Sequence, residues 1–270
     1  MHRRTFFKQS VVLGACLALS PIAPLAQVSS IGDSINKAGR QRMLSQRIAK
    51  AYFQIGQEFD TVNSKRILDW SVTRFDRQLV ELKNYGITPE IKALYLNMER
   101  AWLTYKDLVI GNQPDAQRAK QVLATSEEML TIAERGTKLF EAQMMASGTS
   151  ELGQLINISG RQRMLSQRMA KYYQASAWNL GGSELITALD TAKQEFLAGM
   201  QRLRIATATT AAIREQLSLV YQQWIFFDAA LKQPRTGPQR VQFGTNVATT
   251  SERILELMDA ATGMYEKLGS

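Results

Sequence analysis

Histidine and cysteine are almost missing from this sequence, which has one of each among 270 residues. Both, His2 and Cys16, fall inside a segment that resembles an export signal, so the processed chain is expected to contain neither. Their absence excludes disulfides, zinc sites built on thiolate or imidazole, thiol nucleophiles and histidine acid–base catalysis. Because the remaining residues show no paired nucleophile and base, we expect no enzyme activity, no metal and no cofactor.

Long apolar runs are missing as well, since no segment reaches the roughly 18 uninterrupted apolar residues of a membrane helix. Residues 1–26 instead combine a basic start, a short apolar stretch and a small-residue end, which is typical of a cleaved secretory signal. Arg3 and Arg4 resemble the twin-arginine consensus, which predicts export to the periplasm with cleavage after Ala26. A lipoprotein signal ending at Cys16 is the alternative. Removing the signal lowers the formal charge from +9 to +6.

The chain contains an internal duplication. Residues 35–52 read INKAGRQRMLSQRIAKAY and residues 156–173 read INISGRQRMLSQRMAKYY, with 14 of 18 positions identical. We call these two segments the boxes. Weaker echoes follow in the same order: Trp102 with Trp224, and the tripeptide at 125–127 with that at 250–252. The sequence therefore predicts two tandem repeats, residues 27–147 and 148–270.

Each repeat has the pattern of helices joined by short connections. Apolar residues recur at steps of three and four, and prolines and glycines fall at the breaks. The predicted helices cover residues 30–58, 62–84, 89–110, 115–147, 149–179, 183–206, 209–232 and 239–268. This favours an all-α fold of two tandem antiparallel four-helix bundles. Whether the fourth and fifth helices fuse through residues 147–150 is left open.

One face of each box helix is a seam of small residues with an arginine in its middle. The seams contain Ile35, Ala38, Arg42, Ser45, Ala49 and Tyr52, and Ile156, Ser159, Arg163, Ser166, Ala170 and Tyr173. A buried arginine needs a partner, because an unpaired buried charge costs several kcal/mol. Residues 34–57 and 152–183 contain no Asp or Glu, and this favours an external anion. A planar guanidinium suits a planar oxyanion, and Gly39 and Gly160 would let it approach the backbone.

A competing interpretation keeps the arginine partners inside the chain. Arg42 and Arg163 would then pair across helices with a glutamate such as Glu58, Glu127 or Glu252. The other box arginines are expected to form a solvated face; these are Arg40, Arg47, Arg161 and Arg168.

The box resembles the P-box of bacterial nitrate/nitrite sensor kinases of the NarX/NarQ type and the first helix of PilJ-type domains of type IV pilus chemotaxis transducers. The shared pattern is Ile35-Asn36, Ala38-Gly39, Arg42-Met43 and Ser45-x-Arg47, and it recurs at Ile156-Asn157, Ser159-Gly160, Arg163-Met164 and Ser166-x-Arg168. The resemblance implies a periplasmic four-helix sensor that dimerises through its first helix, so the two bundles of this chain would pack as an internal pseudo-dimer. It also implies a nitrate ligand held by arginines from both subunits. Here the ligand-binding residues would be Arg42, Arg163, Gly39, Gly160, Ser45 and Ser166.

The resemblance therefore predicts a periplasmic receptor for nitrate or nitrite that reports to a membrane-bound sensor kinase or chemotaxis transducer. The second hypothesis is a ligand-free module whose basic boxes dock a membrane receptor or associate peripherally with an anionic membrane surface. Nucleic acid is not expected as a partner, because the export signal removes the chain from the cytoplasm.

Overall fold

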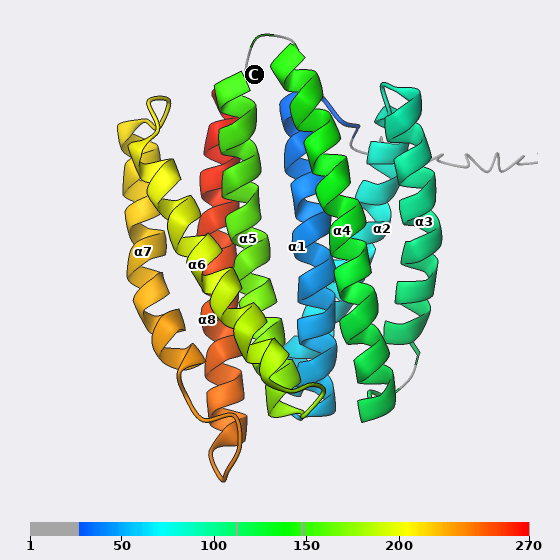
Figure 1. The fold of residues 1–270 in the computed structure, drawn as a ribbon, viewed down its shortest axis with the longest axis vertical. Coiled ribbons are helices and arrows are strands. Elements are labelled where there is room, and N and C mark those ends of the chain that lie inside the picture. Colours follow the sequence, from blue (N-terminus) through cyan, green and yellow to red (C-terminus); the bar gives the residue numbers. More distant parts are fainter. Residues whose placement is uncertain (1–26, 112, 147, 149, 270) are drawn as a thin grey trace, which may run out of the picture.

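The computed structural model describes residues 27–111, 113–146, 148 and 150–269, and within these ranges it contains eight helices and no strand (Figure 1). In chain order the helices are α1 (Ile31–Gly56), α2 (Thr61–Tyr85), α3 (Pro89–Val109), α4 (Ala116–Ala146), α5 (Ser150–Ala177), α6 (Ser183–Ile205), α7 (Ala211–Leu231) and α8 (Arg240–Lys267). The predicted all-α fold is confirmed, and every predicted helix is present with ends within two residues of those observed. The proposed signal, with His2 and Cys16, lies outside the described residues.

Side-chain caps explain where several helices begin. The hydroxyl of Thr88 accepts a hydrogen bond from the backbone N–H of Ile91 at 3.2 Å, and Pro89 occupies the first helical position. Thr210 caps α7 in the same way. Proline has no N–H to satisfy at this position and its fixed φ suits a helix start, so the predicted beginning of α3 is confirmed.

The helices form two four-helix bundles, α1–α4 and α5–α8, joined side by side (Figure 1). Helices α1 and α5 run parallel to each other at the centre and make the most extensive contact of any helix pair. Helix α4 also contacts α5, and α8 also contacts α1, so both long C-terminal helices cross the boundary between the repeats. This arrangement is the predicted internal pseudo-dimer, with the two boxes face to face.

Helices α4 and α5 are separate antiparallel neighbours. Helix α4 ends at Ala146 and α5 begins at Ser150, and Gly148 between them has a positive φ of 87°, which favours glycine. The chain thus reverses direction between the repeats, and the alternative of one fused connecting helix does not apply.

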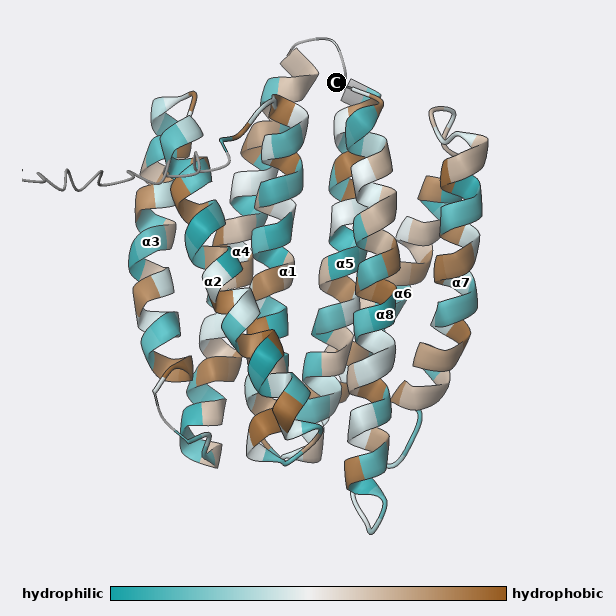
Figure 2. Ribbon diagram, turned by 180° about the vertical axis from the view of Figure 1, so that it is seen from behind, coloured by the Kyte–Doolittle hydropathy of each residue, from teal (hydrophilic) through white to brown (hydrophobic). Residues whose placement is uncertain are grey.

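Each bundle has its own aromatic core. Phe75 stacks on Trp102 with ring centroids 4.0 Å apart, and Phe196 stacks on Trp224 at 4.7 Å. The Trp102/Trp224 echo in the sequence therefore marks equivalent positions in space. Hydrophobic and hydrophilic bands alternate along the helices (Figure 2), as expected for amphipathic helices that bury one face. Among the described helices, none combines the length and the apolar character that a membrane span requires.

Candidate functional site between the box helices

The contact between α1 and α5 brings the two seam arginines together. Arg42 and Arg163 are both fully buried. A Cβ built on Gly39 would lie 3.2 Å from Nη2 of Arg42 and 3.6 Å from Nη2 of Arg163. A Cβ built on Gly160 would meet the same two atoms at 3.6 Å and 3.1 Å. The two guanidinium groups therefore converge on the two glycines, at the centre of the contact between the repeats.

Each seam arginine pairs with a carboxylate of its own repeat. Nη1 of Arg42 donates to Oε2 of Glu134 on α4 at 2.7 Å, and Nη1 of Arg163 donates to Oδ1 of Asp259 on α8. The premise that the partner of these arginines must come from outside the chain is therefore wrong. The competing interpretation is right about an internal partner, although it named other residues.

The same arginines also bind the opposite repeat. Nη2 of Arg42 donates to the carbonyl oxygen of Asn157 at 3.3 Å. Nη2 of Arg163 donates to the carbonyl oxygen of Asn36 at 3.2 Å and to its side-chain oxygen at 2.7 Å. The Nε atoms of both arginines are buried and have no hydrogen-bond partner among the described residues. Each guanidinium thus keeps one unused donor in a buried site.

The two box serines lie beside the arginines but point their hydroxyls elsewhere. Oγ of Ser45 donates to the carbonyl of Arg42 at 2.8 Å, and Oγ of Ser166 makes the matching bond to the carbonyl of Arg163. Both serines are fully buried. Both hydroxyl protons are used in hydrogen bonds within the box helices. The serines therefore contribute their small size, which lets the helices pack closely.

The outer box arginines do not form a solvated face, and that prediction is wrong. Arg40 binds Asp259 at 2.9 Å, and Arg161 binds Glu134 at 3.1 Å, so each carboxylate that holds a seam arginine is shared with an arginine of the other repeat. The side chains of Arg40 and Arg161 are only 14% and 34% exposed. The expectation failed because α8 and α4 cross the repeat boundary and cover this face of the box helices.

Two further ion-pair clusters are exchanged between the repeats. Lys50 and Arg47 of the first repeat bind Glu252 of α8, and Lys171 and Arg168 of the second repeat bind Glu127 of α4. The two lysine side chains are fully buried. Sequence reasoning had not assigned these lysines a role. The repeated tripeptides at 125–127 and 250–252 could have indicated these pairs, because they place Glu127 and Glu252 at equivalent positions of the two repeats.

Burial and pairing shift the ionisation of these groups. Burial lowers the pKa of Lys50 and of Lys171 to about 8, although the partner glutamates oppose it. Burial also lowers the pKa of Arg163 to about 10, opposed by Asp259 and reinforced by Arg40 and Arg42. Burial alone would raise the pKa of Glu252, but the charges of Lys50 and Arg47 outweigh it and hold that pKa at about 2. The carboxylates are therefore ionised at neutral pH.

Every lysine and arginine of the two boxes is engaged in an ion pair within the protein. The full set is Lys37, Arg40, Arg42, Arg47 and Lys50 in the first box, and Arg161, Arg163, Arg168 and Lys171 in the second. Docking through the boxes would require free basic side chains on the surface. The structure therefore argues against the hypothesis of a basic docking surface.

Two equivalent clefts flank the arginine cluster. One, of about 450 Å³, is lined in part by Arg40, Arg47 and Asp259, and the other, of about 470 Å³, is lined in part by Arg161 and Glu134. The side chains of Asp259 and Glu134 are 45% and 22% exposed, whereas those of the seam arginines are fully buried. Solvent reaches the carboxylates from the clefts, and the arginines lie behind them.

The fold and this site define a class: paired helical repeats that share a buried, arginine-centred contact. Residues 24–125 and 144–250 both match the PilJ family, described as type IV pili methyl-accepting chemotaxis transducer N-term, and the chain belongs to this family. The family indicates a sensor module of a signalling system. No curated protein and no solved structure matches the chain. The finer likeness to nitrate sensors of the NarX type stays a prediction.

Proposed function

We propose that this protein is a periplasmic sensor that binds a small planar oxyanion, nitrate or nitrite, between Arg42 and Arg163. It would report occupancy to a separate membrane-bound chemotaxis transducer or sensor kinase. The observation that carries this proposal is the convergence of the two Nη2 atoms on Gly39 and Gly160. Domains of this family are typically periplasmic, which supports the location.

The chemistry of the two arginines suits such a ligand. A guanidinium presents parallel N–H donors in a plane, which match the oxygens of a planar oxyanion. The buried Nε donors of Arg42 and Arg163 have no partner among the described residues, and this supports an additional acceptor at the site. Glycine on both helices removes the Cβ atoms that would crowd a ligand against the backbone.

Binding must compete with the carboxylates that already hold the arginines. In the proposed exchange, the anion enters from a cleft and takes the place of Glu134 or Asp259 on a seam arginine. The displaced carboxylate keeps an arginine of the other repeat, Arg161 or Arg40, as its partner. Because the carboxylates stand on α4 and α8, the exchange would remove one of the ion pairs that hold each of these helices to the box helix of its own repeat, while the pairs with the other repeat remain. Two arrangements of the bundle would result, which is what a sensor requires.

We propose no catalytic role and no resident cofactor. Among the described residues there is no group of three or more His, Cys, Asp or Glu side chains that could hold a metal ion. The proposed function uses only reversible binding and a change in helix packing.

The test is thermal unfolding of the purified protein with nitrate, nitrite, chloride, sulfate or phosphate at constant ionic strength. A specific ligand at 100 times its Kd adds roughly 2.7 kcal/mol. For a chain of this size that corresponds to a Tm increase of roughly 5–10 °C. We expect the increase with nitrate or nitrite alone.

The matched variants are Arg42→Lys and Arg163→Lys, which keep the charge and remove the planar donor pair. Both should abolish the shift, whereas Arg100→Lys, at an exposed position of α3 that lines neither cleft, should leave it intact. An equal response to all five anions, or a nitrate response that survives both seam variants, would disprove the proposed site.

A further inference from the structure

The two clefts beside the seam arginines differ in how their outer arginines are neutralised. In one cleft, Arg161 binds two carboxylates, that of Glu134 on α4 at 3.1 Å and that of Glu195 on α6 at 2.8 Å. In the other cleft, Arg40 binds Asp259 of α8 at 2.9 Å. Within the described residues Arg40 forms no second ion pair, so the carboxylate that α6 supplies to Arg161 has no counterpart on α2.

Helix α2 has an arginine at the position of that missing carboxylate. Phe75 and Phe196 are equivalent, because each stacks on the equivalent tryptophan of its repeat. The residues that precede them are Arg74 and Glu195. Arg74 therefore lies beside Arg40 with a like charge, whereas Glu195 supplies an opposite charge at the same place in the second repeat.

Arg74 has no ion-pair partner in the part of the chain that the structure describes. Its Nε atom is buried and donates to no acceptor there. Burial, and then the positive charges of Arg40 and Arg77, lower the pKa of its guanidinium. The carboxylates that oppose this shift, Glu81 and Asp259, are already bound to other cations. A partly desolvated guanidinium among like charges favours an anion from outside the chain.

The Asp259 side is also the more open of the two. The side chain of Asp259 is 45% exposed, compared with 22% for Glu134. The offset of 125 residues that relates Glu134 to Asp259 also relates Lys138 to Gly263. Lys138 reaches to within 4.0 Å of Glu134, whereas a Cβ built on Gly263 would meet nothing within 4 Å. The first side thus has free space where the second has a lysine.

The cleft between α2 and α8 leads to this free space. Its volume is about 450 Å³, and Trp70 of α2 and Asp259 of α8 are among the residues that line it. Arg74 and Gly263 follow these two residues by one helical turn, and Arg40 lines the cleft from α1. The position beside Arg40 and Arg74 is therefore open to a solvated anion.

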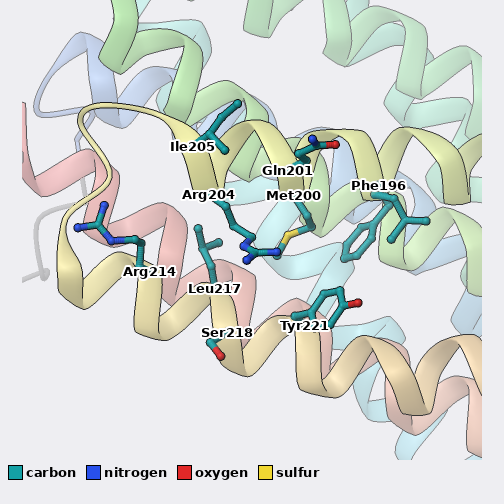
Figure 3. Close-up of a pocket in the computed structure, with 10 residues that line it drawn as sticks. Phe196, Met200, Gln201, Arg204, Ile205, Arg214, Leu217, Ser218 and Tyr221 are labelled. Atoms are coloured by element: carbon teal, nitrogen blue, oxygen red, sulfur yellow. The ribbon is translucent and has the colours of Figure 1, made fainter.

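The groove between α6 and α7, of about 690 Å³, does not offer a comparable pair of cations (Figure 3). The guanidinium of Arg214 donates to the carbonyl oxygen of Thr209 at 2.5 Å and points away from Arg204 in Figure 3. Phe196 and Leu217, which line this groove, belong to the buried core of the second repeat. The cleft between α2 and α8 is therefore the stronger candidate for an anion site.

We propose that a small oxyanion binds between Arg40 and Arg74 at the end of the cleft between α2 and α8, and that Asp259, not Glu134, is the carboxylate that it then displaces from a seam arginine. The second step rests on the proposed function, whereas the first does not require it. On the Asp259 side three arginines lie near one carboxylate, and on the Glu134 side two arginines share two carboxylates. An added anion balances the charge on the Asp259 side, where its oxygens can accept hydrogen bonds from both outer guanidinium groups.

The experiment is isothermal titration calorimetry of the purified protein with nitrate, nitrite, sulfate, phosphate or chloride at constant ionic strength. Arg74→Gln removes the charge and should weaken oxyanion binding about tenfold or more, as expected for the loss of a hydrogen bond to a charged group. Arg74→Glu copies the second repeat, supplies Arg40 with a carboxylate and should abolish binding. Arg100→Glu makes the same change in net charge at an exposed position of α3, so it should alter the Kd by less than about twofold.

The outcomes separate this site from the proposed function. Sulfate or phosphate binding that depends on Arg74, without any nitrate or nitrite binding, would support the outer site and disprove the proposed function. Nitrate binding that Arg163→Lys abolishes and Arg74→Glu leaves unaltered would overturn the outer site alone. The absence of binding by all five anions would overturn both.

A second pair of variants tests which carboxylate is displaced. Asp259→Asn removes the competing charge from Arg163 and should tighten oxyanion binding. Glu134→Gln, the equivalent change on the other side, should not tighten it. No tightening in Asp259→Asn, or an equal gain in both variants, would overturn the assignment to Asp259.

Discussion

Lys50 of the first repeat forms a buried ion pair with Glu252 of the second repeat. Lys171 of the second repeat forms the equivalent pair with Glu127 of the first. Because the partners are exchanged in both directions, the repeats are joined by charges that neither could satisfy within itself. The contact between α1 and α5 thus depends on α4 and α8 as much as on the box helices.

Replacing Glu252 with glutamine should strongly destabilise the protein. Lys50 would be left buried without its carboxylate, and removing one partner of a buried ion pair typically costs about 3–5 kcal/mol. Urea unfolding followed by circular dichroism measures the loss. Adding Lys50→Met should recover much of it, since the unpaired charge is then removed. Glu90→Gln, in an exposed pair, should change the unfolding free energy by less than about 1 kcal/mol.

A methyl group at Gly39 should impair anion binding more than stability. Its Cβ would lie 3.2 Å from Nη2 of Arg42, so the guanidinium must shift by a few tenths of an ångström. Alanine also favours the helix by up to about 1 kcal/mol over glycine, which offsets the crowding. We therefore expect Gly39→Ala to reduce the nitrate-induced Tm increase while the Tm without nitrate stays nearly constant. A full nitrate response in this variant would show that the ligand does not occupy this contact.

Two glycines of α8 should respond in opposite directions to alanine. A Cβ on Gly263 meets nothing within 4 Å, so Gly263→Ala should stabilise the protein by roughly 0.5–1 kcal/mol. A Cβ on Gly244 would lie 2.5 Å from the ring of Phe59, which is fully buried, so Gly244→Ala should destabilise it by roughly 1–3 kcal/mol. Urea unfolding measures the change in unfolding free energy for each variant. Equal changes would mean that the packing of Phe59 against α8 is not as described.

Acid should weaken the protein through the shared carboxylates. The folded-state pKa of Glu252 is about 2, compared with 4.5 for an ordinary glutamate. A lowered folded-state pKa contributes stability that is present above pH 4.5 and is lost as the pH falls towards 2. For Glu252 this amounts to roughly 3 kcal/mol. Unfolding free energies at pH 7, 4 and 3 should fall more steeply in the parent than in Glu252→Gln, and parallel curves would contradict this assignment.

The helical fold could be predicted because its signals are local. Proline and glycine breaks, the Thr88 cap and the three- and four-residue apolar steps each act within one or two turns, so helix ends were predicted closely. The meeting of Arg42 and Arg163 was predicted from the resemblance, which implies that box arginines of two subunits converge, and the duplication places both boxes on one chain.

The partners of those arginines could not be predicted in the same way. Glu134 and Asp259 stand more than 90 residues along the chain from the arginines they bind. Their contact depends on the angle at which α4 and α8 cross the repeat boundary, which no local pattern encodes. The offset of 125 residues that relates the two glutamates of the repeated tripeptides also relates Glu134 to Asp259. A search for acidic residues separated by this offset would have identified Glu134 and Asp259 as candidate partners of the seam arginines.

The exchanged ion pairs also indicate how such a chain can arise from two copies of one repeat. A single repeat contains both halves of the exchange, since Lys50 and Glu127 belong to the first repeat and Lys171 and Glu252 to the second. Two identical copies of one repeat therefore carry everything needed to satisfy each other across a two-fold axis. Gene fusion of such a homodimer would keep its interface and free its two halves to diverge elsewhere.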